Sequence, residues 1–285
     1  MKRLISNKEG ENMKVLKFSQ TVIPLILFML LTSFAYVGSI RTATAEEKNL
    51  PSPQLVTDAW MLFIGYEAAP EAIKAILPPG LEPNPSNMVV MNMYTVPDPS
   101  QTSGFGAYTL TYVTVEVKDH DGYTMGQTTG FPGRYFAFYF NSSELMREFT
   151  KKIGIPAQPG VTKQTVENGK LKSVLEVDGK PFIKATADVG EELQPAIGGH
   201  VNYFGLKKTQ IDGKEVMQIM KYPIPLVVRP VKTENVKVDF TNNIPKDHPL
   251  NRLKPRKIVW ASYMKGSFVY PQPVVLKEWE TTAKK

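Results

Sequence analysis

The chain contains no cysteine, and this absence excludes several kinds of chemistry at once. Disulfide bonds, a thiolate nucleophile and a lipid anchor carried by cysteine are all ruled out. The three histidines, His120, His200 and His248, stand far apart and show none of the short spacings typical of zinc sites. We therefore predict no bound metal and no cofactor, and a fold stabilised by an ordinary apolar core.

Several sequence motifs are missing as well. There is no P-loop, and the glycines of SGFGAY (residues 103–108) lack the third glycine of a dinucleotide fingerprint. No G-x-S-x-G nucleophile elbow occurs. The formal charge of +7 falls to +3 without residues 1–45, which hold six basic and two acidic residues. Because that charge is small and dispersed, we expect no nucleic-acid partner and interpret NRLKPRK (residues 251–257) as a solvated loop.

The first 45 residues have the pattern of a secretory signal peptide. Lys14 and Lys17 precede the apolar run VIPLILFMLL (residues 22–31), and the small residues Ala43 and Ala45 follow it. This order predicts export to the periplasm or the medium, with cleavage after Ala45. The run is shorter than the roughly 20 residues of a membrane span. An uncleaved anchor is the alternative, and it is the one membrane contact we expect.

The sequence also suggests where the chain starts and how it is divided. Met13 begins a more usual signal peptide than Met1 does. Residues 46–59 are polar and contain proline, so we expect a linker or arm there. No repeat or internal linker divides the residues after this arm. We therefore predict a single domain over residues 60–285.

Runs rich in β-branched and aromatic residues dominate this domain and predict strands. These runs are residues 60–66, 88–96, 109–117, 134–140, 236–240 and 257–270. Asp178-Gly179 and Asp212-Gly213 each lie between strand-like runs and predict tight hairpins, since Asp-Gly readily adopts positive φ. The third such step, Asp121-Gly122, follows a strand-like run but leads into a polar stretch, so it has a strand-like run on one side only. The pattern indicates an α+β, β-rich fold.

Two short helices are expected among the strands. The first covers APEAIKAILPPG (residues 69–80), with Pro70 in its first turn and two prolines that stop it. The second begins at an Asn141 cap, with Glu144 completing a capping box, and ends at Gly154. Lys152 lies beside the apolar face of this second helix, so it is the lysine of the Lys151–Lys152 pair that could reach an interior cavity.

Several stretches, taken in order, resemble the acetoacetate decarboxylase family. They are EAIKAILPPGLEP (71–83), SGFGAYT (103–109), GRYFAFYFNSSE (133–144), DGKPFIKATADVG (178–190) and VNYFGLKK (201–208). The resemblance covers about residues 60–240. It implies a closed or cone-like antiparallel or mixed β-barrel with a few flanking helices around an apolar pocket, and assembly into homo-oligomers. It also implies decarboxylation of a 3-oxo acid through a Schiff base on lysine.

The residues that would carry this chemistry are different here. Pro156 matches a proline of the family, which places Ala157 at the position of the reactive lysine and Gln158 at that of its activating neighbour. Leu110 and Asn92 stand where the family has glutamates. The resemblance therefore implies an altered site, without the amine that forms the Schiff base.

Two functions remain open from the sequence. In the first, the pocket binds a small apolar or oxo-acid ligand without Schiff-base chemistry, lined by Asn92, Tyr108, Leu110, Tyr112, Phe138, Ala157 and Gln158. In the second, the protein is a carbon–carbon lyase, a decarboxylase or an aldolase, that uses a relocated amine. Lys152 and Lys184 are the catalytic candidates for that second function, although both amines would be solvated if their side chains face outward.

Overall fold

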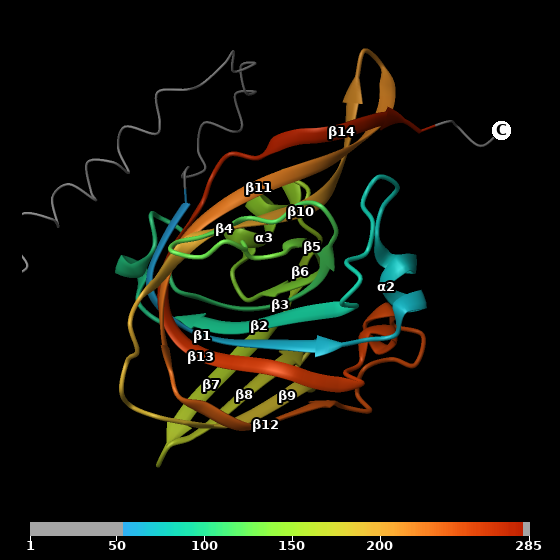
Figure 1. Cartoon of the computed structure of the whole chain (residues 1–285). Coiled ribbons are helices and arrows are strands. Elements are labelled where there is room, and N and C mark those ends of the chain that lie inside the picture. Colours follow the sequence, from blue (N-terminus) through green and yellow to red (C-terminus); the bar gives the residue numbers. More distant parts are fainter. Residues whose placement is uncertain (1–53, 282–285) are drawn as a thin grey trace, which may run out of the picture. The chain divides into compact units, whose positions relative to one another are not determined.

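Seven strands form a closed barrel in the computed structural model, which describes residues 54–281 (Figure 1). The hydrogen-bonding order is β11, β13, β1, β2, β3, β5 and β10, and β10 pairs again with β11 to close the ring. Neighbouring strands are antiparallel except β5 and β10, which are parallel. Their bounds are β1 (Gln54–Glu67), β2 (Met88–Val96), β3 (Tyr108–Val117), β5 (Gly133–Asn141), β10 (Ile197–Ile211), β11 (Lys214–Val231) and β13 (Lys257–Tyr270). The predicted mixed β-barrel is confirmed.

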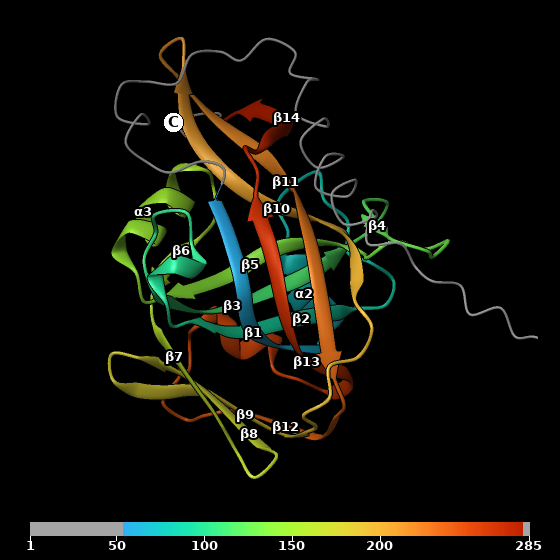
Figure 2. The ribbon, with the colours of Figure 1, turned by 90° about the vertical axis from the view of Figure 1, so that its left-hand side faces the viewer.

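A second, antiparallel sheet of four strands packs against the outside of the barrel (Figures 1 and 2). Its order is β12 (Thr233–Phe240), β9 (Lys180–Val189), β8 (Lys170–Val177) and β7 (Val161–Glu167). Leu62, Met91 and Val113 of the barrel wall share a buried cluster with Leu175 and Ile183 of this sheet. Each such side chain contributes about 1.5–3 kcal/mol when fully buried, so this interface stabilises the wall behind the lumen.

The remaining elements are short and lie around the barrel. They are α2 (Pro70–Ile76), α3 (Glu144–Lys152), the 3-10 turns η3 (Pro99–Gln101) and η4 (Pro249–Leu253), and the strands β4 (Tyr123–Thr124), β6 (Ala157–Pro159) and β14 (Val274–Glu280). β6 pairs in parallel with β5, and β14 extends the sheet beside β11. Neither α-helix within residues 54–281 is long and apolar enough to cross a membrane.

The barrel wall sends alternate side chains to two different cores. On β2, Met91 and Met93 point outward to the cluster beneath the four-stranded sheet, whereas Asn92 and Tyr94 point into the lumen. This follows from the two-residue period of a strand. Both faces of β2 are buried, which explains why its sequence is apolar along almost its whole length.

Two of the three Asp-Gly steps form the expected turns. Asp178-Gly179 joins β8 to β9 with φ of 49° and 71°, and Asp212-Gly213 joins β10 to β11 with φ of 51° and 76°. These positive values are those of a two-residue hairpin. Neither residue of Asp121-Gly122 has a positive φ, and this step lies in the connection from β3 to β4.

The start of the barrel differs from the sequence-based boundary. β1 begins at Gln54 rather than after residue 59, and Gln54, Val56 and Ala59 are completely buried. The segment pairs with β13, from Gln54 opposite Tyr270 onward. The expected arm is therefore too long at its C-terminal end. The predicted signal peptide, residues 1–45, lies outside the described residues.

Helix α3 ends as predicted but begins differently. Ser143, not Asn141, is its N-cap, and the Ser143 hydroxyl accepts the N–H of Met146 at 3.3 Å. Asn141 instead accepts the Ser143 N–H at 2.7 Å, within the turn before the helix. At the other end, Gly154 has a φ of 98°, and its N–H donates to the Lys151 carbonyl. The capping glycine is confirmed.

Gly154→Ala is expected to lower the free energy of unfolding by roughly 1–3 kcal/mol, because an L residue is strained at this φ. A Cβ there would also lie 2.9 Å from the Lys207 Cβ. Gly213→Ala is the matched control, since Gly213 also has a positive φ but no atom lies within 4 Å of its added Cβ. Urea unfolding of both variants should show the larger loss for Gly154→Ala. An equal or smaller loss would contradict close packing of the segment after α3.

Candidate functional site

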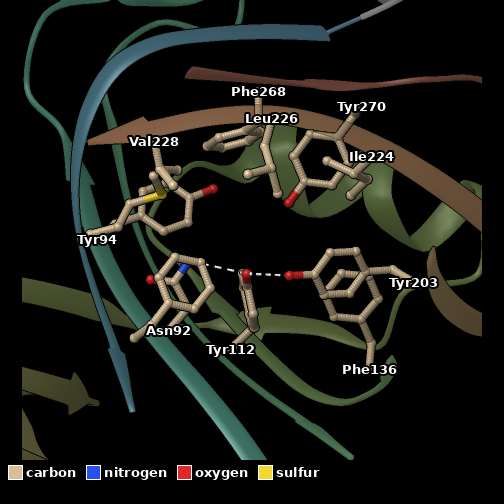
Figure 3. Close-up of a pocket in the computed structure, with 12 residues that line it drawn as sticks. Asn92, Tyr94, Tyr112, Phe136, Tyr203, Ile224, Leu226, Val228, Phe268 and Tyr270 are labelled. Carbon is tan, nitrogen blue, oxygen red and sulfur yellow. Dashed lines mark hydrogen bonds between the residues drawn. The ribbon is translucent and has the colours of Figure 1, made fainter. Parts of the chain in front are cut away.

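The lumen of the barrel contains a cavity with a polar centre (Figure 3). Together with the open solvent at its mouth, it has a volume of about 380 Å³. Apolar side chains from β1, β11 and β13 form much of the wall. The hydroxyls of Tyr94, Tyr112, Tyr203 and Tyr270 point from different strands toward the middle of the cavity. This is the arrangement of a small-molecule site, apolar with a few convergent polar groups.

Hydrogen bonds join these hydroxyls to a buried amide and to one another. The Asn92 side-chain N–H donates to the Tyr112 hydroxyl at 3.0 Å, and the Tyr112 and Tyr203 hydroxyls are 2.9 Å apart. The Tyr94 and Tyr108 hydroxyls form a second pair at 3.2 Å. Asn92 is 1% exposed, so this network is shielded from bulk water and each of its bonds is correspondingly costly to lose.

Tyr94, Tyr108, Tyr112 and Tyr270 of the lumen are uncharged at neutral pH. Burial raises the pKa of Tyr94, Tyr112 and Tyr270 well above the ordinary value of 10.0, and the neighbouring hydroxyls raise these values further. Burial also raises the pKa of Tyr108. Each hydroxyl therefore keeps its proton, so it can donate one hydrogen bond and accept others.

None of the residues that line the cavity carries a charge. The buried charged residues within residues 54–281 are Glu116 and Arg134. They lie opposite each other in the register of β3 and β5 and belong to the lumen-facing phase of these strands. Burial raises the pKa of Glu116, and the Arg134 charge opposes that rise. Sequence reasoning missed this pair. The sequence does contain a signal for it. Glu116 is four residues after Tyr112, so both face the same side of β3, and Arg134 stands at the start of β5.

The residues predicted to line the pocket are only partly brought together. Asn92 and Tyr112 line the cavity, and Tyr108 contacts the lining residue Tyr94 through its hydroxyl. Leu110 is completely buried in the core on the lumen side but does not line the cavity.

Phe138, which was predicted to line the pocket, lies on the opposite face of the barrel wall. It packs outside the lumen, in the cluster beneath the four-stranded sheet, where its ring lies 5.7 Å from that of His248. A β-bulge explains the error: Val113 pairs with Phe138, but the next residue, Thr114, pairs with Phe136. The extra residue shifts the phase of the strand, so that Phe136 and Tyr139 face the lumen instead.

The segment that the resemblance aligns with the family's lysine motif lies against this strand. Ala157 pairs with Tyr139 through β6 and is 5% exposed, within the lumen-side core. Gln158 pairs with Phe140 and is only half-buried. The two side chains therefore differ in environment, as alternate positions of a strand do. A longer side chain at residue 157 would extend among lumen residues.

Neither candidate lysine lies in the cavity. Lys152 is exposed at the end of α3, and Lys184 is exposed on β9 of the outer sheet. On β9 the neighbours Ile183 and Ala185 are the buried ones, so Lys184 faces solvent. The structure therefore brings Asn92 and Tyr112 together but leaves both amines outside.

Comparisons with known proteins agree with this architecture. A family model described as acetoacetate decarboxylase (ADC) matches residues 40–278. An acetoacetate decarboxylase structure is 17% identical with a TM-score of 0.67, covering 84% of this chain and 96% of that one. The acetoacetate decarboxylase of Legionella pneumophila is 20% identical with a TM-score of 0.65, covering 88% and 96%. At these identities the structural likeness shows the fold alone.

A third solved structure with this fold is the enduracididine biosynthesis enzyme MppR, complexed with a condensation product of pyruvate and imidazole 4-carboxaldehyde. It is 14% identical with a TM-score of 0.60, covering 85% of this chain and 98% of that one. A search of curated protein sequences finds no match.

Proposed function

The chain belongs to the acetoacetate decarboxylase family, and we propose that it uses the family's barrel to bind a small uncharged molecule without forming a Schiff base. The observation that carries this proposal is the lining of the cavity. It offers tyrosine hydroxyls and the Asn92 amide, and none of its side chains is charged. Such a surface can bind and orient a ligand. It holds neither a nucleophilic amine nor a general base.

Schiff-base chemistry needs an amine that is neutral at working pH and lies next to the substrate. Burial in a dry pocket lowers a lysine pKa enough to supply that neutral amine. Lys152 and Lys184 are both exposed, so neither lies in such a pocket. Ala157, at the position that the resemblance assigns to the reactive lysine, has no amine. These positions support binding rather than catalysis.

The charge of the ligand follows from the same lining. A carboxylate moved from water into an apolar site is costly unless a cation or several donors compensate it. Arg134, the buried cation within residues 54–281, lies opposite Glu116 in the strand register and does not line the cavity. We therefore infer an uncharged ligand and not the anion of an oxo acid. The limited free volume of the lumen favours a ligand of only a few carbon atoms.

Reductive trapping tests the absence of a Schiff base. The protein is incubated with acetoacetate or pyruvate and borohydride, and its intact mass is measured. We expect no gain in mass on trapping, as for a variant that retains two cationic side chains but cannot form the imine, Lys152→Arg combined with Lys184→Arg. A stoichiometric adduct on either lysine of the wild-type protein would overturn the proposal and favour the relocated-amine lyase.

Binding is tested with two ligands of similar size. Cyclopentanone is uncharged, whereas cyclopentanecarboxylate is an anion at pH 7. Saturation-transfer NMR with each should give at least about tenfold tighter binding of cyclopentanone, the ratio that corresponds to roughly 1.4 kcal/mol of uncompensated charge burial. Tighter binding of the carboxylate, or no binding of either ligand, would contradict an uncharged ligand site.

We also propose that the protein is exported. The support is the basic, apolar and small-residue order of the first 45 residues. The test is the N-terminal sequence of protein recovered from a cell envelope or culture medium. It should begin at Glu46, and an intact N-terminus would contradict cleavage.

A further inference from the structure

The direction of the hydrogen bonds at the polar centre of the cavity is set by one residue, Asn92. Its amide presents N–H, and not oxygen, to the Tyr112 hydroxyl at 3.0 Å. The Tyr112 oxygen therefore accepts, and the Tyr112 proton must point elsewhere. The Asn92 side-chain oxygen has no hydrogen-bond partner among the described residues.

Counting protons shows what the pair offers to a ligand. Tyr112 and Tyr203 together carry two hydroxyl protons, and one of them is used in the 2.9 Å bond between the two rings. The other proton cannot go to Asn92, because Asn92 donates to this pair. One O–H is therefore left over. Both hydroxyls point toward the cavity (Figure 3), so the remaining proton is available to a ligand.

A second pair shows the same pattern. The Gln54 side-chain N–H donates to the Tyr108 hydroxyl at 3.5 Å, and Tyr108 is bonded to Tyr94. Gln54 is completely buried, and its side-chain oxygen also lacks a partner in residues 54–281. Two buried amides thus supply donors to two tyrosine pairs, and each pair has one hydroxyl proton that is not used in the bond between its two rings.

We propose that Asn92 is a specificity-determining residue and that the group recognised at the polar centre is an uncharged acceptor oxygen, such as the carbonyl of a ketone, ester or amide. This inference rests on the proposed function, since it names the chemistry of the same site. A carbonyl oxygen accepts the free O–H without having to donate. An alcohol oxygen can accept the same O–H, but the alcohol must also place its own proton in the lumen, a requirement that a carbonyl does not have.

A negatively charged side chain at residue 92 would reverse the direction of its hydrogen bond with the Tyr112 hydroxyl. Asn92→Asp keeps the shape of the side chain, but a carboxylate only accepts hydrogen bonds. The Tyr112 proton would then point to residue 92, and the pair would present lone pairs to the cavity. The variant should therefore favour a ligand that donates.

The experiment compares three probes of one shape: cyclopentanone, cyclopentanol and methylenecyclopentane. For the wild-type protein we expect cyclopentanone to bind roughly 5- to 10-fold more tightly than the other two, the effect of about one net hydrogen bond. Asn92→Asp should abolish or reverse the preference over cyclopentanol. Asn202→Asp is the matched control, because Asn202 is a buried asparagine that donates to the carbonyls of His120 and Asp121 and does not line the cavity; it should retain the preference.

Each outcome has one meaning. If none of the three probes binds, the proposed function fails. If all three bind equally, or cyclopentanol binds best, the binding function stands and the inferred polarity is wrong. If the preference survives in Asn92→Asp, Asn92 does not set it. The infrared carbonyl stretch of bound ¹³C-labelled cyclopentanone gives an independent measurement on the wild-type protein. It should lie below its value in hexane, and an unshifted band would overturn the O–H donor.

Discussion

Phe136→Ala is expected to enlarge the lumen and to let the barrel bind ligands that the wild-type protein excludes. The Phe136 ring stacks on Tyr203 at 4.8 Å and meets the Tyr112 ring edge-on at 5.4 Å. It is 1% exposed and forms part of the cavity wall. Its truncation should lower the free energy of unfolding by about 3–5 kcal/mol, and the space that it leaves should be continuous with the cavity.

Phe138→Ala is a matched control on the same strand. It removes the same ring from an almost equally buried site, but on the outer face of the wall. Urea unfolding should show a loss of stability for both variants. Only Phe136→Ala should improve the binding of 4-tert-butylcyclohexanone relative to cyclopentanone. Improved binding in Phe138→Ala would show that this ring faces the lumen and that the bulge is misplaced.

The parts of the fold that follow from local sequence signals were predictable. β2 and β13 have the predicted bounds, because both are unbroken runs of strand-forming residues. The hairpins at Asp178-Gly179 and Asp212-Gly213 follow from turn chemistry alone. Asn168-Gly169 forms the same kind of turn between β7 and β8, with φ of 49° and 72°. This dipeptide could have been recognised in the same way.

Other parts depend on contacts between distant segments. β14 is an edge strand in which Val274, Val275 and Leu276 are all exposed, so it lacks the alternation that identifies a half-buried strand. The division into a barrel and a second sheet is also set by pairing at long range.

The site was predictable as far as strand phase could be followed. On β3, Tyr108, Leu110 and Tyr112 keep the two-residue period, and all three lie on the lumen side. On β5 the bulge breaks that period between Phe136 and Phe138. A bulge is a property of the pairing of two strands. The sequence of β5 alone therefore could not show which of its aromatic rings would line the cavity.

The second large effect is expected from Ala157→Lys, which places an amine at the position that the resemblance assigns to the reactive lysine. The new side chain would enter the lumen-side core next to Tyr139. Burial disfavours the charged amine, so its pKa should fall by about three units from the ordinary value of roughly 10.4. At pH 7 the variant should be less stable by about 4 kcal/mol, since each unit corresponds to 1.36 kcal/mol.

The sign of the pH dependence distinguishes this cause from simple overpacking. Between a folded pKa near 7 and the unfolded value, the unfolded chain binds more protons, so stability rises with pH across that window and is flat above it. Unfolding at pH 7 and pH 10.5 measures the rise. Gln158→Lys is the control, because residue 158 is half-buried and pairs with Phe140 rather than Tyr139; its stability should change little with pH.

Reactivity should follow the same residue. With cyclopentanone and borohydride, Ala157→Lys should give a covalent adduct at residue 157, whereas the wild-type protein and Gln158→Lys should give none, because only a buried amine in the lumen-side core is both neutral at pH 7 and close to the cavity. An adduct would mean that the barrel still holds the substrate geometry and lacks only the amine. If the stability of the variant matches that of the wild-type protein, does not depend on pH, and no adduct forms, residue 157 lies in solvent. The binding function would then rest on the lumen tyrosines and Asn92 alone.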